Sequence, residues 1–178
     1  MQFTETRITG AYIIDTDRLA DERGFFALTW ARDEFVAHGL NPNLAQCNLS
    51  YNHRSGTVRG MHWQAPPYAE TKLVRCIRGG IYDVVADIRT DSPTYLQWVG
   101  IELTAENRRA LYIPEGCAHG FQTVEDASEV LYMITENYTP AAANGMRWND
   151  PKIAVTWPHA VTVISERDAR YPDFAAKT

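Results

Sequence analysis

The chain has few cysteines, and they lack the spacing that usually gives cysteine a structural role. Its 178 residues include three, Cys47, Cys76 and Cys117, with no Cys-x-x-Cys pair. An odd number at wide spacing argues against a disulfide framework and against a zinc ribbon. A chain of this length buries roughly 70% of its unfolded surface, so it needs no such cross-link to fold.

A surplus of positive charge and a long hydrophobic run are also absent. The formal net charge is −5 and the isoelectric point is near 5.5, which argues against general nucleic-acid binding but leaves room for a local basic pocket for phosphate. No stretch approaches 18 apolar residues, and residues 1–7 contain no apolar core of a signal peptide. We therefore expect a cytoplasmic protein that binds neither nucleic acid nor membrane.

No internal repeat, low-complexity tract or long linker interrupts the sequence. Together with the length, this predicts a single domain covering residues 1–178.

Short segments of alternating apolar and polar residues recur instead, and residues 81–89 show the pattern best. Asp83, Asp87 and Arg89 lie on one face of this segment together with Ile81 and Val85. The other face is apolar and consists of Tyr82, Val84, Ala86 and Ile88. A period of two is typical of a half-buried strand.

Glycine, proline and aspartate separate further strand-like segments. In addition to residues 81–89, strands are predicted at 72–78, 95–103, 109–113, 120–124 and 129–136. Helical patterns are confined to residues 33–38 and a turn near 165–169. Many short strands with little helix indicate an antiparallel sandwich or barrel, in which alternate side chains can converge on one pocket.

Residues 56–76 place a histidine among fixed cations. The segment contains His62, Arg59, Lys72 and Arg75 among strand-like residues. An imidazole near its neutral form, surrounded by positive charge, suits the removal of a proton from an anionic substrate. An ordinary sheet with charged ends is an equally good interpretation of this segment alone.

Eight strings along the chain resemble one known family. They include Val-Arg-Gly-Met-His-Trp-Gln at 58–64 and Ile-Pro-Glu-Gly-Cys-Ala-His-Gly-Phe at 113–121. The others are 21–26, 72–75, 82–89, 91–94, 147–151 and 165–168. In order and spacing they resemble the dTDP-4-dehydrorhamnose 3,5-epimerase family of the cupin superfamily, over nearly the whole chain.

The resemblance implies an all-β, antiparallel jelly-roll (cupin-like) barrel with short peripheral helices, usually assembled as a homodimer. It also implies a nucleoside-diphosphate 4-keto-6-deoxyhexose as substrate. The default reaction converts dTDP-4-dehydro-6-deoxy-D-glucose to dTDP-4-dehydro-L-rhamnose. No redox cofactor or metal is expected, because the C4 ketone itself acidifies the C3 and C5 protons by delocalising the carbanion into an enolate.

The resemblance also assigns roles to residues. His62 matches the catalytic base, and Asp168 matches the carboxylate that pairs with it. Tyr132 matches the proton donor on the other face of the sugar, and Lys72 matches the cation near the keto oxygen. Tyr138 matches the residue that stacks on the nucleobase. Positions that contact substrate in the family are matched by Arg23, Gln46, Asn48, Arg59, His119 and Arg167.

Simpler interpretations compete with some of these roles. His119 could satisfy a turn, Arg23 and Arg59 could be surface charges, and Tyr132 could pack in the core with its hydroxyl at the rim. A cupin metal site would usually offer His-x-His followed closely by Glu, whereas position 64 is Gln64, so we expect no metal. The remaining histidines, His38, His53 and His159, are predicted on the surface.

Two positions depart from the family pattern. The family tends to have glutamate where this chain has Leu28 and Ala143, both on the nucleotide-binding side. The nucleobase therefore stays open, with dTDP as the default and CDP as an alternative. A single-centre epimerase acting at C3 or C5, a non-catalytic cupin that binds sugar nucleotides, and a metal-dependent cupin enzyme are the other readings.

Overall fold

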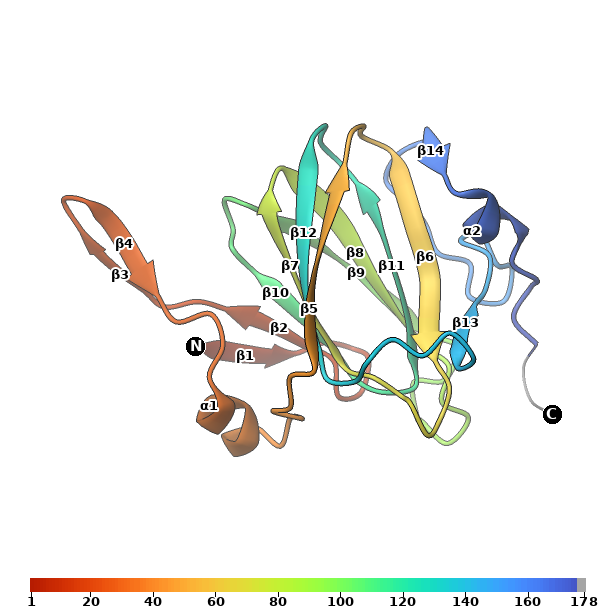
Figure 1. Cartoon of the computed structure of the whole chain (residues 1–178), viewed down its shortest axis with the longest axis horizontal. Helices are drawn as coiled ribbons and strands as arrows, with labels where there is room; N and C mark the ends of the chain where they lie inside the picture. The colour runs from red at the N-terminus through yellow and green to blue at the C-terminus, as the bar shows by residue number, and fades with distance from the viewer. Residues whose placement is uncertain (176–178) are drawn as a thin grey trace.

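The structure is a computed structural model that describes residues 1–175, and two six-stranded sheets face each other in these residues (Figure 1). The order in the first sheet is β1 (Gln2–Glu5), β2 (Tyr12–Asp15), β10 (Ala110–Ile113), β7 (Lys72–Arg78), β12 (Ser128–Ile134) and β5 (Gln46–Asn52). The order in the second is β13 (Ala143–Gly145), β6 (Thr57–Gln64), β11 (Cys117–Thr123), β8 (Gly80–Asp87) and β9 (Trp98–Thr104), with β14 (Val163–Ile164) beside β6. Neighbouring strands are antiparallel except β14, which runs parallel to β6. The predicted antiparallel jelly-roll is confirmed.

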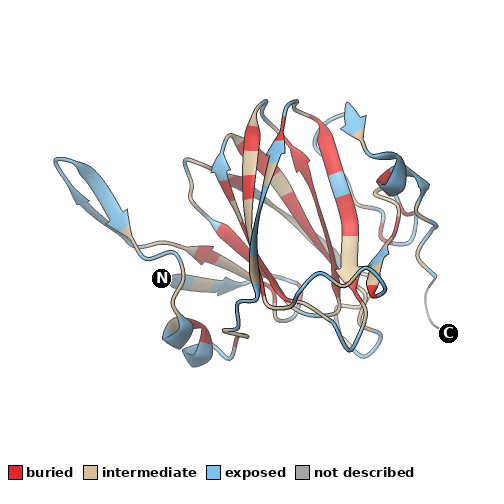
Figure 2. Cartoon of the chain, viewed as in Figure 1, coloured by how far each residue is buried: buried red, intermediate tan, exposed pale blue. Residues whose placement is uncertain are grey.

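The main core lies between the two sheets. Val74 and Leu111 come from the first sheet, and Val85 and Phe121 come from the second; none is more than 1% exposed. In Figure 2 the buried residues follow the strands of both sheets. Burying side chains of this size stabilises the fold by roughly 1.5–3 kcal/mol each.

The sequence predicts the strands better than their ends. Segment 72–78 coincides with β7, whereas β11 begins at Cys117, three residues before the predicted start. The helices α1 (Arg32–Ala37) and α2 (Glu166–Arg170) lie where helical patterns are predicted. No helix within residues 1–175 is long and apolar enough to cross a membrane.

The prediction that residues 81–89 form a half-buried strand is wrong. The inner face of β8 carries Asp83 and Asp87, both 0% exposed, into the space between the sheets. Its outer face is also buried, because Val84 packs with Met146 and Ile153 in a second layer of chain. The alternation therefore marks two different buried environments.

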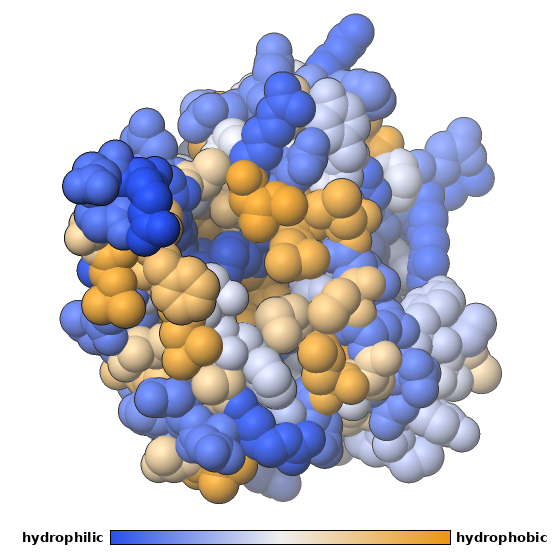
Figure 3. All heavy atoms as spheres, turned by 60° about the vertical axis from the view of Figure 1, so that its left-hand side comes forward, coloured by the Kyte–Doolittle hydropathy of each residue, from blue (hydrophilic) through white to orange (hydrophobic). Residues whose placement is uncertain are grey.

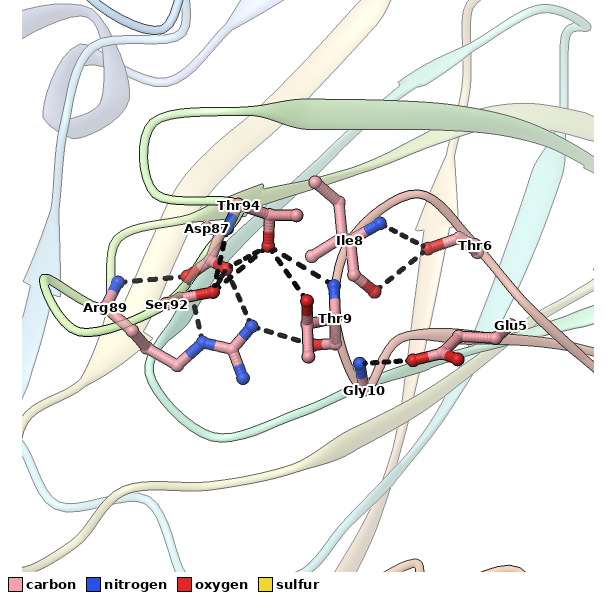
Figure 4. A network of polar contacts seen from close by, with 9 residues as sticks. All are labelled: Glu5, Thr6, Ile8, Thr9, Gly10, Asp87, Arg89, Ser92 and Thr94. Atoms are coloured by element: carbon pink, nitrogen blue, oxygen red, sulfur yellow. Dashed lines mark hydrogen bonds and ion pairs between the residues drawn. The ribbon is translucent and has the colours of Figure 1, made fainter.

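A polar network secures the end of β8 (Figure 4). Asp87 accepts hydrogen bonds from Arg89 Nε at 2.8 Å, Ser92 Oγ at 2.5 Å and Thr94 Oγ1 at 2.6 Å. Burial alone would raise the pKa of Asp87, but these hydrogen bonds lower it to about 2. Arg89 also donates to the backbone oxygen of Thr9 at 2.7 Å, which ties the β1–β2 loop to the second sheet.

A hairpin of β3 (Arg18–Asp21) and β4 (Gly24–Ala27) stands away from the sandwich (Figure 1). Leu19 and Phe26 on this arm are 71% and 74% exposed. Figure 3 shows the side of the molecule from which the hairpin projects, where apolar side chains gather around a hollow. Such an exposed apolar arm is unusual on a monomer and is typical of an interaction surface.

Candidate active site

A cavity of about 470 Å³ is lined by side chains from both sheets and from α2. A second cavity of about 200 Å³ adjoins it and shares His62 and Lys72. The predicted site residues that line the first cavity are Asn48, Arg59, His62, Lys72, His119, Tyr132 and Asp168. The second cavity adds Gln46, Tyr138 and Arg167. Residues spread over more than 120 positions of the sequence thus meet in one place.

A β-bulge in β6 directs two predicted site residues into the same cavity. His119 pairs with His62 and Phe121 pairs with Arg59, so two steps along β11 match three along β6. The extra residue in β6 interrupts the usual alternation of side chains. Arg59 and His62, three positions apart, consequently both line the cavity.

Two glycines make room for this bulge. Gly60 has a φ of +126°, and a Cβ there would lie 2.5 Å from the Cα of Gly120. A Cβ on Gly120 would lie 2.8 Å from the backbone oxygen of Arg59. A side chain at either glycine would therefore push β6 and β11 apart.

His62 and Asp168 form a hydrogen-bonded pair in the cavity wall. Nε2 of His62 lies 2.7 Å from Oδ1 of Asp168, and the Gly60 amide donates to Oδ2 at 3.2 Å. Ser165 caps α2 by accepting from the Asp168 amide at 3.1 Å, which fixes the start of this helix. Burial alone would raise the pKa of Asp168, but the hydrogen bond and charge of His62 and the Gly60 amide lower it. Asp168 is therefore an ionised partner for the imidazole.

His119 forms a second pair, with Asp83, in a more buried position. Nε2 of His119 lies 2.7 Å from Oδ1 of Asp83, and the two side chains are only 6% and 0% exposed. The alternative that His119 satisfies a turn is wrong, because the residue lies within β11. Complete burial raises the pKa of Asp83, while the charge and hydrogen bond of His119 and the charge of Lys72 oppose this.

Tyr132 enters the first cavity from β12, in the sheet opposite to His62. Its ring meets the imidazole of His119 edge to face, with 6.0 Å between centroids. Burial, reinforced by the charge of Asp83, raises the pKa of Tyr132 well above its usual range. The hydroxyl therefore keeps its proton at neutral pH.

Lys72, at the start of β7, lines both cavities. Its Nζ lies 3.0 Å from Oε1 of Glu70 and donates to the backbone oxygen of His62 at 3.3 Å. The side chains of Lys72 and Glu70 are only 9% and 10% exposed. The ammonium is thus held by a partly buried ion pair beside the backbone of the histidine.

Asp83 and Glu70 are the two acidic residues of the site that sequence reasoning misses. Asp83 shares a face of its strand with Ile81 and Val85, which are both buried in the core. These two apolar neighbours were the signal in the sequence that this face is buried. Glu70 lies in the Pro-Pro-Tyr loop region before β7, and no local pattern indicates that it pairs with Lys72.

The remaining polar residues are held by neighbouring side chains. Arg59 donates from Nε to Oδ1 of buried Asn52 at 2.8 Å. In the second cavity, Gln46 accepts from the Tyr138 amide at 3.1 Å. Hydrogen bonds to Tyr138 and Tyr171 raise the pKa of Arg167. The site therefore offers fixed cations in both cavities.

Two arginines lie elsewhere. Arg23 lines neither cavity; it is on the β3–β4 hairpin, where its side chain is 85% exposed and pairs with Asp21 at 2.5 Å. The prediction that Arg75 joins the cations around His62 is wrong. Arg75 is three residues from Lys72, so it points to the other face of β7, and it donates to backbone oxygens of Arg108 and Thr29.

The other histidines of the chain lie on the surface. His38, His53 and His159 are exposed, as predicted. Within residues 1–175, no group of three or more His, Cys, Asp or Glu side chains is arranged to hold a metal ion.

Together, the fold and the site define a cupin-type jelly-roll protein with a histidine–carboxylate pair in the wall of a cavity that both sheets line. The family profile described as dTDP-4-dehydrorhamnose 3,5-epimerase matches residues 5–176. The chain belongs to this family.

Individual relatives agree with this assignment. A dTDP-4-dehydrorhamnose 3,5-epimerase of Sinorhizobium fredii is 39% identical, over 97% of this chain and 89% of its own length. A dTDP-4-dehydrorhamnose 3-epimerase of Streptomyces niveus is also 39% identical, over 94% of this chain and 81% of its own. The 3,5-epimerase of Bacillus anthracis, crystallised with TDP and PPi, superimposes with a TM-score of 0.93 at 38% identity, covering 97% of this chain and 99% of its own.

Proposed function

We propose that the protein epimerises dTDP-4-dehydro-6-deoxy-D-glucose at C3 and C5 to give dTDP-4-dehydro-L-rhamnose. The observation that carries the proposal is the 2.7 Å hydrogen bond between His62 and Asp168 in the cavity that Tyr132 and Lys72 also line. Family membership supplies the substrate class, and this acid–base set supplies groups suited to moving protons beside a ketone.

His62 is the base in this proposal. The ionised carboxylate of Asp168 accepts from Nε2–H, so the neutral imidazole carries its lone pair on Nδ1. Nδ1 takes the proton from the carbon next to the C4 ketone, and the electrons of the C–H bond delocalise onto the keto oxygen. Asp168 then stabilises the imidazolium that forms, as a carboxylate does for a catalytic histidine elsewhere.

Lys72 stabilises the enolate oxygen. Its ammonium is fixed by Glu70 at 3.0 Å, so it needs little reorganisation when negative charge develops on the substrate. Preorganised charge of this kind commonly contributes about 3–4 kcal/mol to the transition state.

Tyr132 returns a proton to the opposite face of the carbon. It reaches the cavity from the first sheet, whereas His62 comes from the second, so a sugar between the sheets has one residue on each side. The raised pKa of Tyr132 keeps the hydroxyl protonated until the enolate carbon takes its proton. Afterwards the imidazolium of His62 gives its proton to solvent and the phenolate of Tyr132 takes one from solvent, which restores both residues.

The nucleotide occupies the second cavity and its surroundings. Tyr138 is 55% exposed and offers a ring on which the base can stack. Arg59 and Arg167 offer positive charge for the diphosphate. Leu28 and Ala143 cannot accept hydrogen bonds through their side chains. We therefore expect kcat/KM for dTDP- and CDP-linked substrates to differ by less than about a hundredfold, or about 2.7 kcal/mol. A larger preference would show that other residues read the base.

A second copy of the chain completes the site. Arg23 lies on the apolar β3–β4 arm and reaches neither cavity of its own chain. In a homodimer that exchanges these arms, Arg23 would join the site of the other copy. Light scattering should give a dimer, and Phe26→Asp should give monomers with weakened substrate binding. A wild-type monomer with full activity would contradict this arrangement.

Incubation with the dTDP- and CDP-linked 4-keto-6-deoxyglucose substrates in D₂O tests the function. NMR should show deuterium at both C3 and C5 together with the inverted product. Exchange at one carbon would favour a single-centre epimerase, which the similarity to the Streptomyces niveus 3-epimerase makes the second candidate. Binding with no exchange at either carbon would indicate a non-catalytic cupin. Cytoplasmic residence stays a prediction.

A further inference from the structure

Tyr171 is the first residue after α2, and its ring lies against the strand next to His62. A Cβ on Gly145 would lie 2.4 Å from Cε2 and Cζ of the Tyr171 ring. Gly145 of β13 is directly paired with His62 of β6. The ring therefore fills the space that a side chain on Gly145 would take, and its centroid is 5.8 Å from the imidazole of His62 at an interplanar angle of 65°.

The hydroxyl of Tyr171 holds a different group. It accepts a hydrogen bond from Nε of Arg167 at 2.7 Å. Arg167 lines the second cavity next to Tyr138. One side chain thus contacts both the imidazole of the first cavity and the guanidinium of the second.

The segment that carries Tyr171 is fixed on both sides. Before it, the Ser165 cap orders α2. After it, Asp173 pairs with Arg147 at 2.5 Å, and the backbone oxygen of Phe174 accepts from Nζ of Lys152 at 2.9 Å. These contacts hold the backbone on both sides of the tyrosine and do not involve the side chains of His62 or Arg167.

We propose that Tyr171 is a positioning residue with two separable parts. Its ring restricts the imidazole of His62 to the orientation that meets Asp168, and its hydroxyl holds Arg167 in place for the anionic part of the nucleotide sugar. The kinetic consequences rest on the proposed function, since they require His62 to be the base. The structural consequences do not.

Tyr171→Phe and Tyr171→Ala separate the two parts. Phenylalanine keeps the ring on Gly145 and loses the hydroxyl, so KM for dTDP-4-dehydro-6-deoxy-D-glucose should rise about fivefold while kcat is unchanged. Alanine loses both, so kcat should also fall, by about tenfold. Phenylalanine would then restore kcat but not KM. Arg170→Ala is the matched control on α2, because the Arg170 side chain is 78% exposed and forms an ion pair with the exposed Glu166 at 3.6 Å.

The NMR signals of the His62 imidazole provide a readout without substrate. The Tyr171 ring should shift them through its ring current, so Tyr171→Ala should move them and Tyr171→Phe should leave them nearly in place. Unmoved signals in Tyr171→Ala would overturn the proposal, whatever the activity of the wild type. The proposal would also be overturned if both variants showed the same fall in kcat, the same rise in KM and the same fall in Tm. That result would indicate a structural role only. A wild type without turnover but with the expected NMR shifts would refute the proposed function alone.

Discussion

The two histidine–carboxylate pairs of the cavity have the same hydrogen bond and opposite surroundings. In both, Nε2 of the histidine lies 2.7 Å from a carboxylate oxygen. The His62 side chain is 39% exposed and that of His119 only 6%. Asp168 comes from a short helix near the end of the chain, whereas Asp83 comes from the strand next to His119. Identical contacts thus occur at the accessible wall and in the interior.

This difference indicates that one pair serves catalysis and the other serves stability. A base must reach its substrate, and a partly exposed imidazole can do so without opening the sheets. The pair of His119 and Asp83 is enclosed by both layers, where a charge without its partner is costly. We expect substitutions of His62 and Asp168 to affect turnover first and substitutions of His119 and Asp83 to affect stability first.

The largest expected effect is on turnover. His62→Asn should lower kcat/KM by about 10³-fold or more, the range expected when general base catalysis is removed, and should leave Tm close to that of the wild type. Steady-state kinetics with dTDP-4-dehydro-6-deoxy-D-glucose and calorimetry measure the two. Near wild-type turnover would show that the accessible pair is not the catalytic one.

The next effect is on the free energy of unfolding, where we expect the pair of His119 and Asp83 to matter more than the pair of His62 and Asp168. Asp83→Ala leaves His119 buried without its partner and should cost about 3 kcal/mol of unfolding free energy. Asp168→Ala also removes a buried carboxylate, but the His62 side chain that it leaves behind is 39% exposed and can bond to water, so the loss should be about 1–2 kcal/mol. Urea unfolding at pH 7 compares them. An equal or larger loss for Asp168→Ala would break the distinction between the interior and the wall.

Tyr132→Phe tests the catalytic role of the residue that faces His62 from the opposite sheet. The ring still packs against His119, but no proton can be returned, so product formation should fall by about 10²-fold. Loss of the substrate C–H proton to D₂O should fall less, because His62 and Asp168 are intact. NMR follows both in one sample. Equal losses would place Tyr132 in an earlier step.

The smallest effect is the pH dependence of stability, with opposite signs for the two carboxylates. The pKa of Asp168 is lowered from 3.8, so its contribution is present above pH 3.8 and is lost as pH falls through the folded-state pKa. The pKa of Asp83 is raised from 3.8, so its ionised form opposes folding at neutral pH, and stability returns as pH falls through the raised value.

Differences in Tm against the Asn variants measure this. Relative to Asp83→Asn, the wild type should gain stability as pH falls from 7 towards 4. Relative to Asp168→Asn, the difference should stay constant over that range and shrink only below pH 3.8. Two differences of the same sign would contradict the assigned directions.

The sequence predicts most of the sheets because their strands obey local rules. Residues 72–78 and 129–136 are rich in apolar residues and are followed by glycine or asparagine, and both are strands within two residues of the prediction. The pairing of His62 with Asp168 spans 106 positions and no local pattern encodes it; only the family resemblance indicates it.

The parts that escape prediction depend on tertiary context. The period of two predicts which residues share a face of β8, but it does not predict what covers each face. The burial of Asp83 and its pairing with His119 are therefore not predicted. The bulge at Gly60 changes which β6 residues face inwards, and nothing in the sequence shows how β6 and β11 are registered. Arg23 matches a substrate-contacting position, yet it lies on an arm that leaves its own chain's site.

Deuterium exchange by His62→Asn tests the central claim most directly. The wild type in D₂O should incorporate deuterium at C3 and C5 of dTDP-4-dehydro-6-deoxy-D-glucose, and Asp168→Asn should do so more slowly. His62→Asn, folded and still binding dTDP, should incorporate none above the rate without enzyme. Exchange at either carbon at near the wild-type rate would contradict the assignment of His62 as the base.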